Sequence, residues 1–521
     1  MIMTNDFYFG PRSGYKTSDE EKNMTSLKPI ENLESFPFLY NYSFDLKKDG
    51  KFYDTTIKQI LKLKHFLSTE RKTSILVNGQ VQSGKTSFII GSINYAIDLS
   101  YNLIFFLAGS TNDLLNQSLD RLKEKLKESK KINIKSISTM SPLNNYLNKD
   151  EVLVCTVLKE TKNLANLNSF INSANLVNQK VLLIDDEADY ASVNVGGKND
   201  KSKIFDSING ILIIKSLNTK YLAITATPFS NILTNSFSSE MYPDYMINLV
   251  PNPNYTGNNF FNKHNNYFIL NNTKHNFDID EEKITEILVL FFYISSQEQK
   301  KNQKSQLLFN IDLNNNSHSQ LRSKIINICQ RHIHKFLNHL FDSQYFFDKK
   351  MDQYGINYSE EMLNEAKTTF LKFYQNLDEN IYELNGTNKD AIVNQKNIEI
   401  IIGGILLSRG ITFENLAIEV LLNVPKGPIA MDTLLQRARW FGYRKENYQT
   451  MKIFMPSMAR ETFVAYDEVL EILKHNQLDY ENLSVLNKEE ILHIKKDLEF
   501  FQKKNKNLFK LTNKKGEDKN D

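Results

Sequence analysis

A glycine-rich segment has the residue types and spacing of a phosphate-binding loop. The letters GQVQSGKT at positions 79–86 match the pattern G-x-x-x-x-G-K-S/T at every position. The glycines let the backbone amides curl around a phosphate, and a helix that follows adds the positive end of its dipole. We therefore predict a nucleotide site in which Lys85 reaches the β- and γ-phosphates and the Thr86 hydroxyl binds Mg²⁺. The residues assigned to this loop are Gly79, Gln82, Ser83, Gly84, Lys85 and Thr86. A strand-to-helix turn without nucleotide is the alternative.

A second group of candidate residues is a run of acids that follows four apolar residues at 181–184. At the carboxyl edge of a parallel sheet such acids face the ligand crevice, whereas unpaired carboxylates inside a core would be costly. Asp186 is predicted to hold Mg²⁺, directly or through water, and Glu187 to orient and deprotonate an attacking water. Asp185 ranks below these two. The alternative is a solvated acidic loop that caps the next helix.

Hydroxyl residues follow another apolar strand, in the sequence TATP at 225–228. Thr225 and Thr227 are short enough to bridge the acidic cluster to groups across a cleft. A simple turn closed by a threonine hydroxyl explains the motif equally well.

Arginines gather late in the chain, in QRARWFGYR at 436–444 and in SRGITF at 408–413. Guanidinium groups are planar, permanently charged forks that suit a γ-phosphate. The residues predicted to act there are Gln436, Arg439, Arg444 and Arg409. The alternative is a surface helix whose aromatic face, including Trp440, packs inward while the arginines stay solvated.

The elements that must position these residues alternate regularly along the chain. Apolar strands are expected at 74–78, 103–107, 152–155, 181–184 and 221–224, and again at 306–311, 398–403, 417–422 and 452–455. Polar, helix-like stretches separate them. Continuous apolar strands separated by helices predict parallel sheets covered on both faces. The fold class is therefore α/β, with two lobes of this kind.

We divide the chain into five segments from changes in composition and pattern. They are an N-terminal segment (1–70), a nucleotide-binding lobe (71–245), a turn-rich linker (246–300), a second lobe (301–460) and a helical C-terminal extension with a disordered end (461–521). A helical insert at 320–385 interrupts the second lobe.

Composition limits the classes of protein that this chain can be. It has 521 residues, and 64 Lys and Arg against 61 Asp and Glu leave a net charge of +3. Bulk charge therefore does not indicate nucleic-acid binding, which would need a local basic surface. The two cysteines are too few for a disulfide scaffold. No secretory signal is visible, and the longest apolar run, Ile287 to Ile294, is shorter than the ~20 residues that span a bilayer. We expect a soluble, cytoplasmic protein without membrane contact.

The motifs GQVQSGKT, DDEAD, TATP, SRGIT and QRARWFGYR, in this order, resemble those of the two RecA-like lobes of superfamily-two helicases. The longer strings DEADYASVN, TATPFSN, LSRGITFENL and DTLLQRARWFGYR are more closely similar to the Z-one domain family. That domain is labelled an endonuclease domain and occurs beside bacterial restriction–modification and phage-defence genes. The resemblance extends from about Leu76 to Pro456.

This resemblance implies an ATP- and Mg²⁺-dependent ATPase of helicase or translocase type that is stimulated by DNA and serves restriction or defence proteins. It implies that Thr225 and Thr227 couple hydrolysis to movement, that Arg409 lies in the fifth motif, and that the sixth motif holds the arginine finger. Common helicases space the last motif as Q-R-x-x-R-x-x-R, but here Arg439 comes one residue early and Arg444 follows five later. Either arginine is therefore a candidate for the finger.

Two other functions stay open from the sequence. One is a nucleotide-gated scaffold that recruits a methylase or nuclease without moving along DNA. The other is an endonuclease with an unrecognised site, although neither an H-N-H nor an H-K-D pattern is present and no E-x-K follows the Pro-Asp at 243–244.

Overall fold

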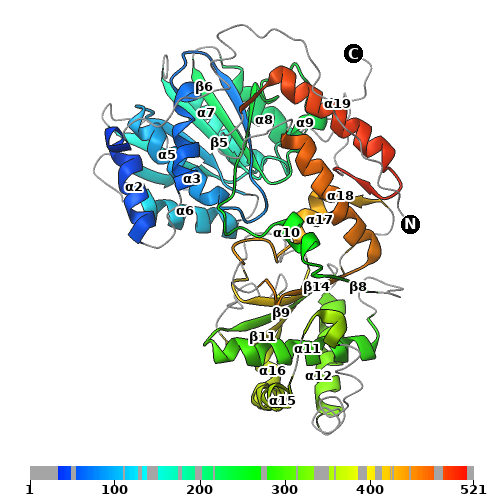
Figure 1. Cartoon of the computed structure of the whole chain (residues 1–521). Helices are drawn as coiled ribbons and strands as arrows, with labels where there is room; N and C mark the ends of the chain where they lie inside the picture. The colour runs from blue at the N-terminus through cyan, green and yellow to red at the C-terminus, as the bar shows by residue number, and fades with distance from the viewer. Residues whose placement is uncertain are drawn as a thin grey trace.

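The computed structural model describes residues 33–48, 54–109, 112–126, 132–137, 151–173, 179–193, 202–214, 217–270, 279–311, 315–331, 333, 351–356, 359–384, 396–404, 413–422, 424, 428–444, 448–474 and 485–512. These residues form two α/β lobes, joined by a connecting segment (249–266) and by a C-terminal extension (457–512) that contacts both lobes (Figure 1).

The first lobe is built on an eight-stranded sheet with the order β15-β7-β1-β6-β5-β2-β4-β3. The strands are β1 (Thr73–Asn78), β2 (Leu103–Leu107), β3 (Ile132–Ser136), β4 (Val152–Val157), β5 (Lys180–Asp186), β6 (Asn218–Thr225), β7 (Tyr245–Asn248) and β15 (Val485–Asn487). All neighbours pair in parallel except β15, which runs antiparallel to β7. The phosphate-binding loop and the acidic run therefore emerge at the same edge of this sheet.

Helices cover both faces of the first sheet, as its fully buried central strands require. They are α2 (Pro37–Lys48), α3 (Asp54–Leu61), α4 (Lys64–Leu67), α5 (Lys85–Asp98), α6 (Asn112–Leu126), α7 (Thr161–Ser173), α8 (Lys203–Leu212) and α9 (Phe229–Leu233). Alternate residues of β1 face opposite cores. Ile75 and Val77 pack with the α2 to α6 side, and Leu76 packs with the α7 and α8 side.

The second lobe has a six-stranded, wholly parallel sheet with the order β10-β11-β9-β12-β14-β8. Its strands are β8 (Tyr267–Ile269), β9 (Ser305–Asn310), β10 (Ile381–Leu384), β11 (Ile398–Gly403), β12 (Leu416–Leu421) and β14 (Lys452–Met455). The helices around it include α11 (Glu281–Lys300), α12 (Asn315–Arg331), α15 (Glu360–Tyr374), α16 (Leu377–Asn380) and α17 (Met431–Arg437).

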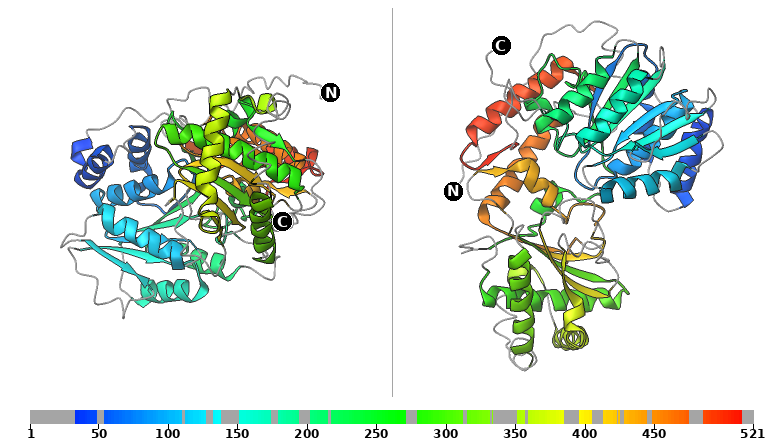
Figure 2. Two further views of the ribbon diagram at one scale, coloured as in Figure 1. Left: turned by 90° about the horizontal axis from the view of Figure 1, so that it is seen from below. Right: turned by 180° about the vertical axis from the view of Figure 1, so that it is seen from behind.

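The C-terminal extension runs from the second lobe back to the first (Figure 2). Helix α18 (Ser457–Lys474) packs on α10 (Asn258–Lys263) of the connecting segment, and α19 (Lys488–Lys504) packs on α9 and β7 of the first lobe. Strand β16 (Phe509–Lys510) then pairs with β13 (Ile429–Ala430), which directly precedes α17. The extension therefore contributes to the first sheet and also contacts the segment that leads to the clustered arginines.

The predicted fold class is confirmed: both halves are parallel sheets flanked by helices, and the expected strands recur as β1, β2, β4, β5, β6, β9, β11, β12 and β14. The segment expected as a linker, 246–300, differs. It contains most of β7, the whole of β8, and α11, in which a run of buried residues from Ile284 to Ser296 packs in the second lobe's core. Short strands of three or four residues carry too little pattern to be recognised among turn residues.

Two further expectations also differ in detail. The insert expected to be helical, 320–385, ends in strand β10, and the extension expected to be helical contains β15 and β16. Residues 1–32 and 513–521, which include the end expected to be disordered, lie outside the described residues. Among the helices that the structure describes, none combines the length and apolar character needed to cross a bilayer.

Candidate active site between the lobes

The phosphate-binding loop joins β1 to α5 in a conformation that depends on its glycines. Gly84 has a φ of +99°, in the left-handed region that favours glycine. A β-carbon on Gly79 would lie 2.8 Å from Cγ of Lys85, so the first glycine admits the lysine side chain. The Lys85 amine donates hydrogen bonds to the carbonyl oxygens of Gly79 (3.1 Å) and Gln80 (2.9 Å). The lysine is therefore folded over the mouth of its own loop.

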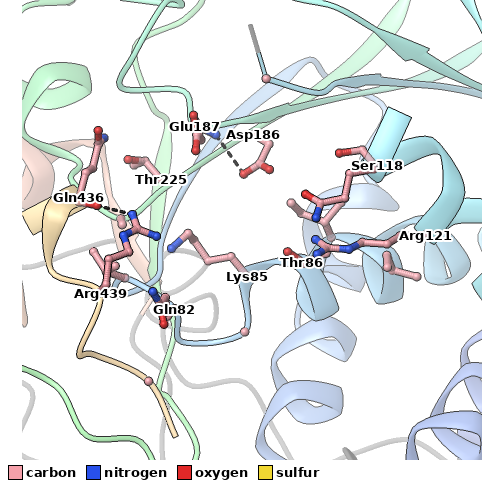
Figure 3. A pocket seen from close by; sticks show the side chains of 18 of the residues that line it. Gln82, Lys85, Thr86, Ser118, Arg121, Asp186, Glu187, Thr225, Gln436 and Arg439 are labelled. Atoms are coloured by element: carbon pink, nitrogen blue, oxygen red, sulfur yellow. Dashed lines mark hydrogen bonds between the residues drawn. The ribbon is translucent and has the colours of Figure 1, made fainter. Parts of the chain in front are cut away.

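A pocket of about 480 Å³ opens beside this loop, between the lobes (Figure 3). Side chains from both lobes line it. From the first lobe come Gln82, Lys85, Thr86, Asp186, Glu187, Asp189 and Thr225, and from the second lobe Glu414, Gln436, Arg439, Tyr443 and Arg444. The pocket therefore collects most of the residues that the sequence predicts to do chemistry. Arg409 lies outside the described residues, together with the other residues of 405–412.

The acidic turn after β5 places two carboxylates on the pocket. The backbone amide of Glu187 donates to Oδ1 of Asp186 at 3.0 Å, and Glu187 has a φ of +52°, unusual for a residue with a side chain. Burial, followed by the neighbouring Glu187 charge, raises the pKa of Asp186 to about 6. Burial lowers the pKa of Lys85, and the charges of Asp186 and Asp189 oppose that shift.

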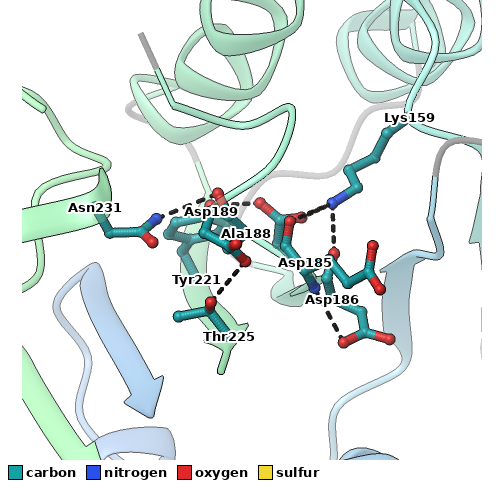
Figure 4. Close-up of polar contacts among 9 residues, drawn as sticks. Lys159, Asp185, Asp186, Ala188, Asp189, Tyr221, Thr225 and Asn231 are labelled. Atoms are coloured by element: carbon teal, nitrogen blue, oxygen red, sulfur yellow. Dashed lines mark hydrogen bonds and ion pairs between the residues drawn. The ribbon is translucent and has the colours of Figure 1, made fainter. Parts of the chain in front are cut away.

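Asp185 is fully buried, does not line the pocket, and lies between Lys159 and Tyr221 (Figure 4). Its Oδ1 forms a buried ion pair with Nζ of Lys159 at 3.1 Å, and its Oδ2 accepts a hydrogen bond from the Tyr221 hydroxyl at 2.7 Å. Both carboxylate oxygens are therefore engaged inside the first lobe.

Asp189 is the centre of a hydrogen-bond network that the sequence analysis did not assign. Its Oδ1 accepts from the Thr225 hydroxyl (2.6 Å), and its Oδ2 accepts from the Thr227 hydroxyl (2.7 Å) and from Nε2 of Gln436 (2.8 Å). Thr225 and Thr227 are fully buried. The signal available in the sequence was the acid three residues after Asp186, which a turn brings back over the strand end.

The two candidate finger arginines have different surroundings. Arg439 points into the pocket near Lys85, and its charge contributes to the lowered pKa of Lys85 (Figure 3). Arg444 instead donates to the carbonyl oxygens of Glu414 (2.6 Å), Phe413 and Arg439 (3.2 Å). Although Arg444 borders the pocket, its guanidinium binds carbonyls of the segment before β12. It thereby links that segment to the arginine-bearing loop, residues 438–444.

Glu419 lies on β12 beneath this loop and was also missed. Its Oε2 accepts from the backbone amide of Arg439 at 3.2 Å, and its Oε1 accepts from Nδ2 of Asn310 at 3.3 Å. Burial raises the pKa of Glu419 to about 8, although the charges of Arg439 and Arg444 oppose the shift. The sequence signal was one acid in the middle of an apolar strand, AIEVLL at 417–422.

Two tyrosines hold the outer face of the phosphate-binding loop, and we call this pair, Tyr255 and Tyr443, the tyrosine clasp. The Tyr255 hydroxyl donates to the carbonyl oxygen of Val81 (2.6 Å), and the Tyr443 hydroxyl donates to that of Ser83 (2.9 Å). Their rings meet edge to face with centroids 5.9 Å apart. The clasp attaches the connecting segment and the arginine-bearing loop directly to the loop that the sequence predicts to bind phosphate.

The residues present fit a nucleoside triphosphate with a divalent cation. The left-handed Gly84 at the start of a long helix, the cavity, and the Lys85 amine at the loop mouth suit a phosphate chain. The Thr86 hydroxyl and the Asp186 carboxylate line the same pocket and are the hard oxygen ligands that Mg²⁺ prefers.

Comparison with known proteins gives one family match, over the later part of the chain, and weak structural similarities. The Z1 domain family profile matches residues 285–499, the segment that holds Glu419, Gln436, Arg439 and Arg444 but not the phosphate-binding loop. No curated protein matches the chain.

Three solved structures illustrate the structural likenesses. The DUF1998 helicase MrfA bound to DNA is 12% identical, with 86% of this chain and 52% of that chain covered and a TM-score of 0.49. S. cerevisiae Dbp5 bound to RNA and ADP BeF3 is 15% identical (85% and 99% covered, TM-score 0.44). RecG bound to a three-way DNA junction is 13% identical (93% and 54% covered, TM-score 0.44). The chain spans about half the length of MrfA and of RecG.

Proposed function

We propose that this protein is an ATP- and Mg²⁺-dependent ATPase of helicase or translocase type, stimulated by nucleic acid. One observation carries the proposal. A phosphate-binding loop, an acidic turn and an arginine from the other lobe line a single pocket between two parallel α/β lobes. Such a pocket is complete only when both lobes contribute, so hydrolysis would depend on how the lobes sit.

The first lobe would bind and activate the substrate. Lys85 would leave its loop carbonyls for the phosphate chain, and Thr86 and Asp186 would hold the cation. Bound Mg²⁺ would neutralise charge on the phosphate oxygens. Glu187 sits beside Asp186 on the same turn and would orient a water and accept its proton.

The second lobe would supply the charge that stabilises the transition state. We assign this role to Arg439. One of its guanidinium nitrogens donates to the carbonyl oxygen of Gln436, but its side chain still faces Lys85 in the pocket, whereas the Arg444 guanidinium donates to three backbone carbonyls. Gln436 would link the second lobe to the acidic turn through its hydrogen bond to Asp189, so that a shift of the second lobe changes this contact. Thr225 and Thr227 donate to the same carboxylate. This network is the physical basis we propose for coupling hydrolysis to lobe movement.

DNA is the polymer we favour, through the motif resemblance and within a restriction or phage-defence setting. Backbone contacts across both lobes would give little sequence preference and strong salt dependence.

The test is ATP hydrolysis by the full chain, alone and with single- or double-stranded DNA or RNA, at two salt concentrations. We expect one polymer to raise the rate and added salt to weaken that effect. Lys85→Ala should abolish turnover, and an unchanged rate in that variant would overturn the assignment.

A nucleotide-gated scaffold is the second candidate, and the C-terminal extension favours it. This extension adds β15 to the first sheet and pairs β16 with β13 of the second lobe, so it ties the lobes together. A large translocating motion would have to release or stretch that connection. Hydrolysis that no polymer changes would favour the scaffold. Cleavage of nucleic acid is not part of this proposal.

A further inference from the structure

Lys159 is a buried lysine directly behind the acidic turn, between β4 and α7, and no motif marks it. Its side chain is inaccessible to solvent. Its Nζ contacts three oxygens: Oδ1 of Asp185 at 3.1 Å, the carbonyl oxygen of Glu187 at 3.0 Å and the carbonyl oxygen of Asp186 (Figure 4). An ammonium group has three N–H donors, so this environment satisfies the group completely.

Two of these three acceptors belong to the main chain of the residues that face the pocket. The Asp186 and Glu187 side chains point to the pocket, while their carbonyl oxygens turn back to Lys159. Glu187 also has a positive φ, a conformation that a residue with a β-carbon keeps only when its surroundings enforce it. Lys159 supplies such a constraint, because it holds the carbonyls on both sides of the Glu187 amide and α-carbon.

The ion pair with Asp185 explains how a charged amine can sit there. A buried lysine without a partner would be costly, and Asp185 compensates its charge while Tyr221 occupies the other carboxylate oxygen. Asp185 therefore serves the acidic turn indirectly, through Lys159.

We infer that Lys159 is the positioning residue of the acidic turn, fixing the main chain from which Asp186 and Glu187 reach the pocket. The inference rests on the proposed function, because it assigns those two carboxylates to cation and water. Lys159 touches neither substrate nor reacting atoms. Its effect would be on the rate of the chemical step and on cation affinity, while nucleotide would still be held by the loop at 79–86.

The chain contains a matched control. Lys220 is also fully buried, and it donates to the carbonyl oxygen (2.9 Å) and the hydroxyl (2.8 Å) of Thr69 and to the carbonyl oxygen of Arg71. It lies near the amino-terminal end of β6 and does not line the pocket, whereas the acidic turn follows the carboxyl-terminal end of the neighbouring β5. Lys220→Met therefore removes a buried amine that binds main-chain carbonyls, without touching the acidic turn.

The test compares Lys220→Met with Lys159→Met/Asp185→Asn. The double variant removes both charges, so it leaves no uncompensated buried carboxylate and should fold. We expect its kcat for ATP to fall at least 10-fold while the affinity for a fluorescent ATP analogue changes less than 3-fold. Lys220→Met should keep its kcat within 3-fold of wild type, once both variants are shown to be folded at the assay temperature.

A second readout does not depend on turnover. Binding of Mn²⁺ in the presence of a non-hydrolysable ATP analogue, followed by electron paramagnetic resonance, should weaken at least 5-fold in the double variant and stay unchanged in Lys220→Met. Wild-type kcat and Mn²⁺ affinity in the folded double variant would overturn the inference about Lys159. Absence of hydrolysis in the wild type, with every polymer, would instead overturn the proposed function, while the Mn²⁺ measurement would still decide the role of Lys159.

Discussion

The Nε2 atom of Gln436 lies 2.8 Å from Oδ2 of Asp189, and this hydrogen bond joins the two lobes at the pocket. The two residues are 247 positions apart in the chain. The Asp189 carboxylate is buried and also receives the hydroxyls of Thr225 and Thr227. A movement of the second lobe that breaks this bond leaves a buried acceptor short of one donor, so the bond gives lobe closure an energetic consequence beside the acidic turn.

Replacing Gln436 tests that coupling. A hydrogen bond to a charged group contributes about 1.5–3 kcal/mol, so Gln436→Ala should lower the polymer-stimulated kcat by roughly 10- to 100-fold. Binding of a fluorescent ATP analogue should stay close to wild type, because the phosphate-binding loop is unchanged. Gln436→Glu, which places a like charge against Asp189, should be at least as impaired. Full stimulation in Gln436→Ala would argue against coupling through this bond.

Substitution of Arg439 should mainly lower the rate of ATP hydrolysis, whereas substitution of Arg444 should mainly lower the free energy of unfolding. Arg439→Ala should reduce kcat by about 10³-fold, the low end for loss of an arginine finger. Arg444→Ala leaves three backbone carbonyls without their donor, so we expect unfolding free energy to fall by about 2–4 kcal/mol. Steady-state kinetics and urea unfolding of both variants provide the measurements. The reverse outcome would transfer the finger role to Arg444.

The raised pKa of Asp186 leads us to expect that activity falls at acidic pH. Its pKa is raised to about 6, mainly by burial, and only the ionised carboxylate can hold a cation. The kcat/KM for ATP at subsaturating Mg²⁺ should therefore rise from pH 5 to pH 7 with a midpoint near 6, and saturating Mg²⁺ should shift that midpoint downwards. A flat profile across this range would contradict the assigned role of Asp186.

Glu419 predicts how stability depends on pH. Its folded pKa of about 8 lies above the value of about 4.3 in an unfolded chain, so the unfolded state loses its proton first as the pH rises. This group therefore stabilises the fold most below pH 4, and its contribution declines up to about pH 8. Glu419→Gln should remove a decline of a few kcal/mol, so urea midpoints of the variant should vary less with pH than those of the wild type. Equal pH dependence in both proteins would refute this reading.

The tyrosine clasp gives a prediction that separates hydroxyl from ring. Tyr443→Phe and Tyr255→Phe each remove one hydrogen bond to the phosphate-binding loop and keep the edge-to-face ring contact. Each should cost about 1 kcal/mol in nucleotide affinity, a roughly fivefold rise in Kd. Their combined effect should differ from the sum, because both bonds hold one loop and their rings touch. Isothermal titration with a non-hydrolysable analogue measures these terms, and strict additivity would show that the tyrosines act independently.

Much of the architecture was predictable because it is written in local patterns. Mainly apolar runs at 398–403 and 452–455 became β11 and β14 with those limits, since a strand buried on both faces is apolar at most positions; Glu399 and Lys452 are the buried exceptions. The strand-to-helix turn at 79–86 could also be predicted from sequence, because its glycines and lysine contact neighbours only a few residues away. Short strands such as β8 and β15 escaped notice because three residues cannot display a period.

The sequence by itself determined which residues carry charge, hydroxyls and backbone freedom, and along which strands they must emerge. Only the tertiary structure decided how they pair. Asp185 and Asp186 are adjacent acids in identical surroundings along the chain, yet the alternation of a strand sends one to Lys159 in the core and the other to the pocket. Arg439 and Arg444 carry the same group, but two of the three carbonyls that accept from Arg444 belong to Phe413 and Glu414, about thirty residues earlier and just before β12. Partners so distant in sequence leave no periodic or local trace, because hydrogen bonds and ion pairs depend on distances that only the packed lobes create.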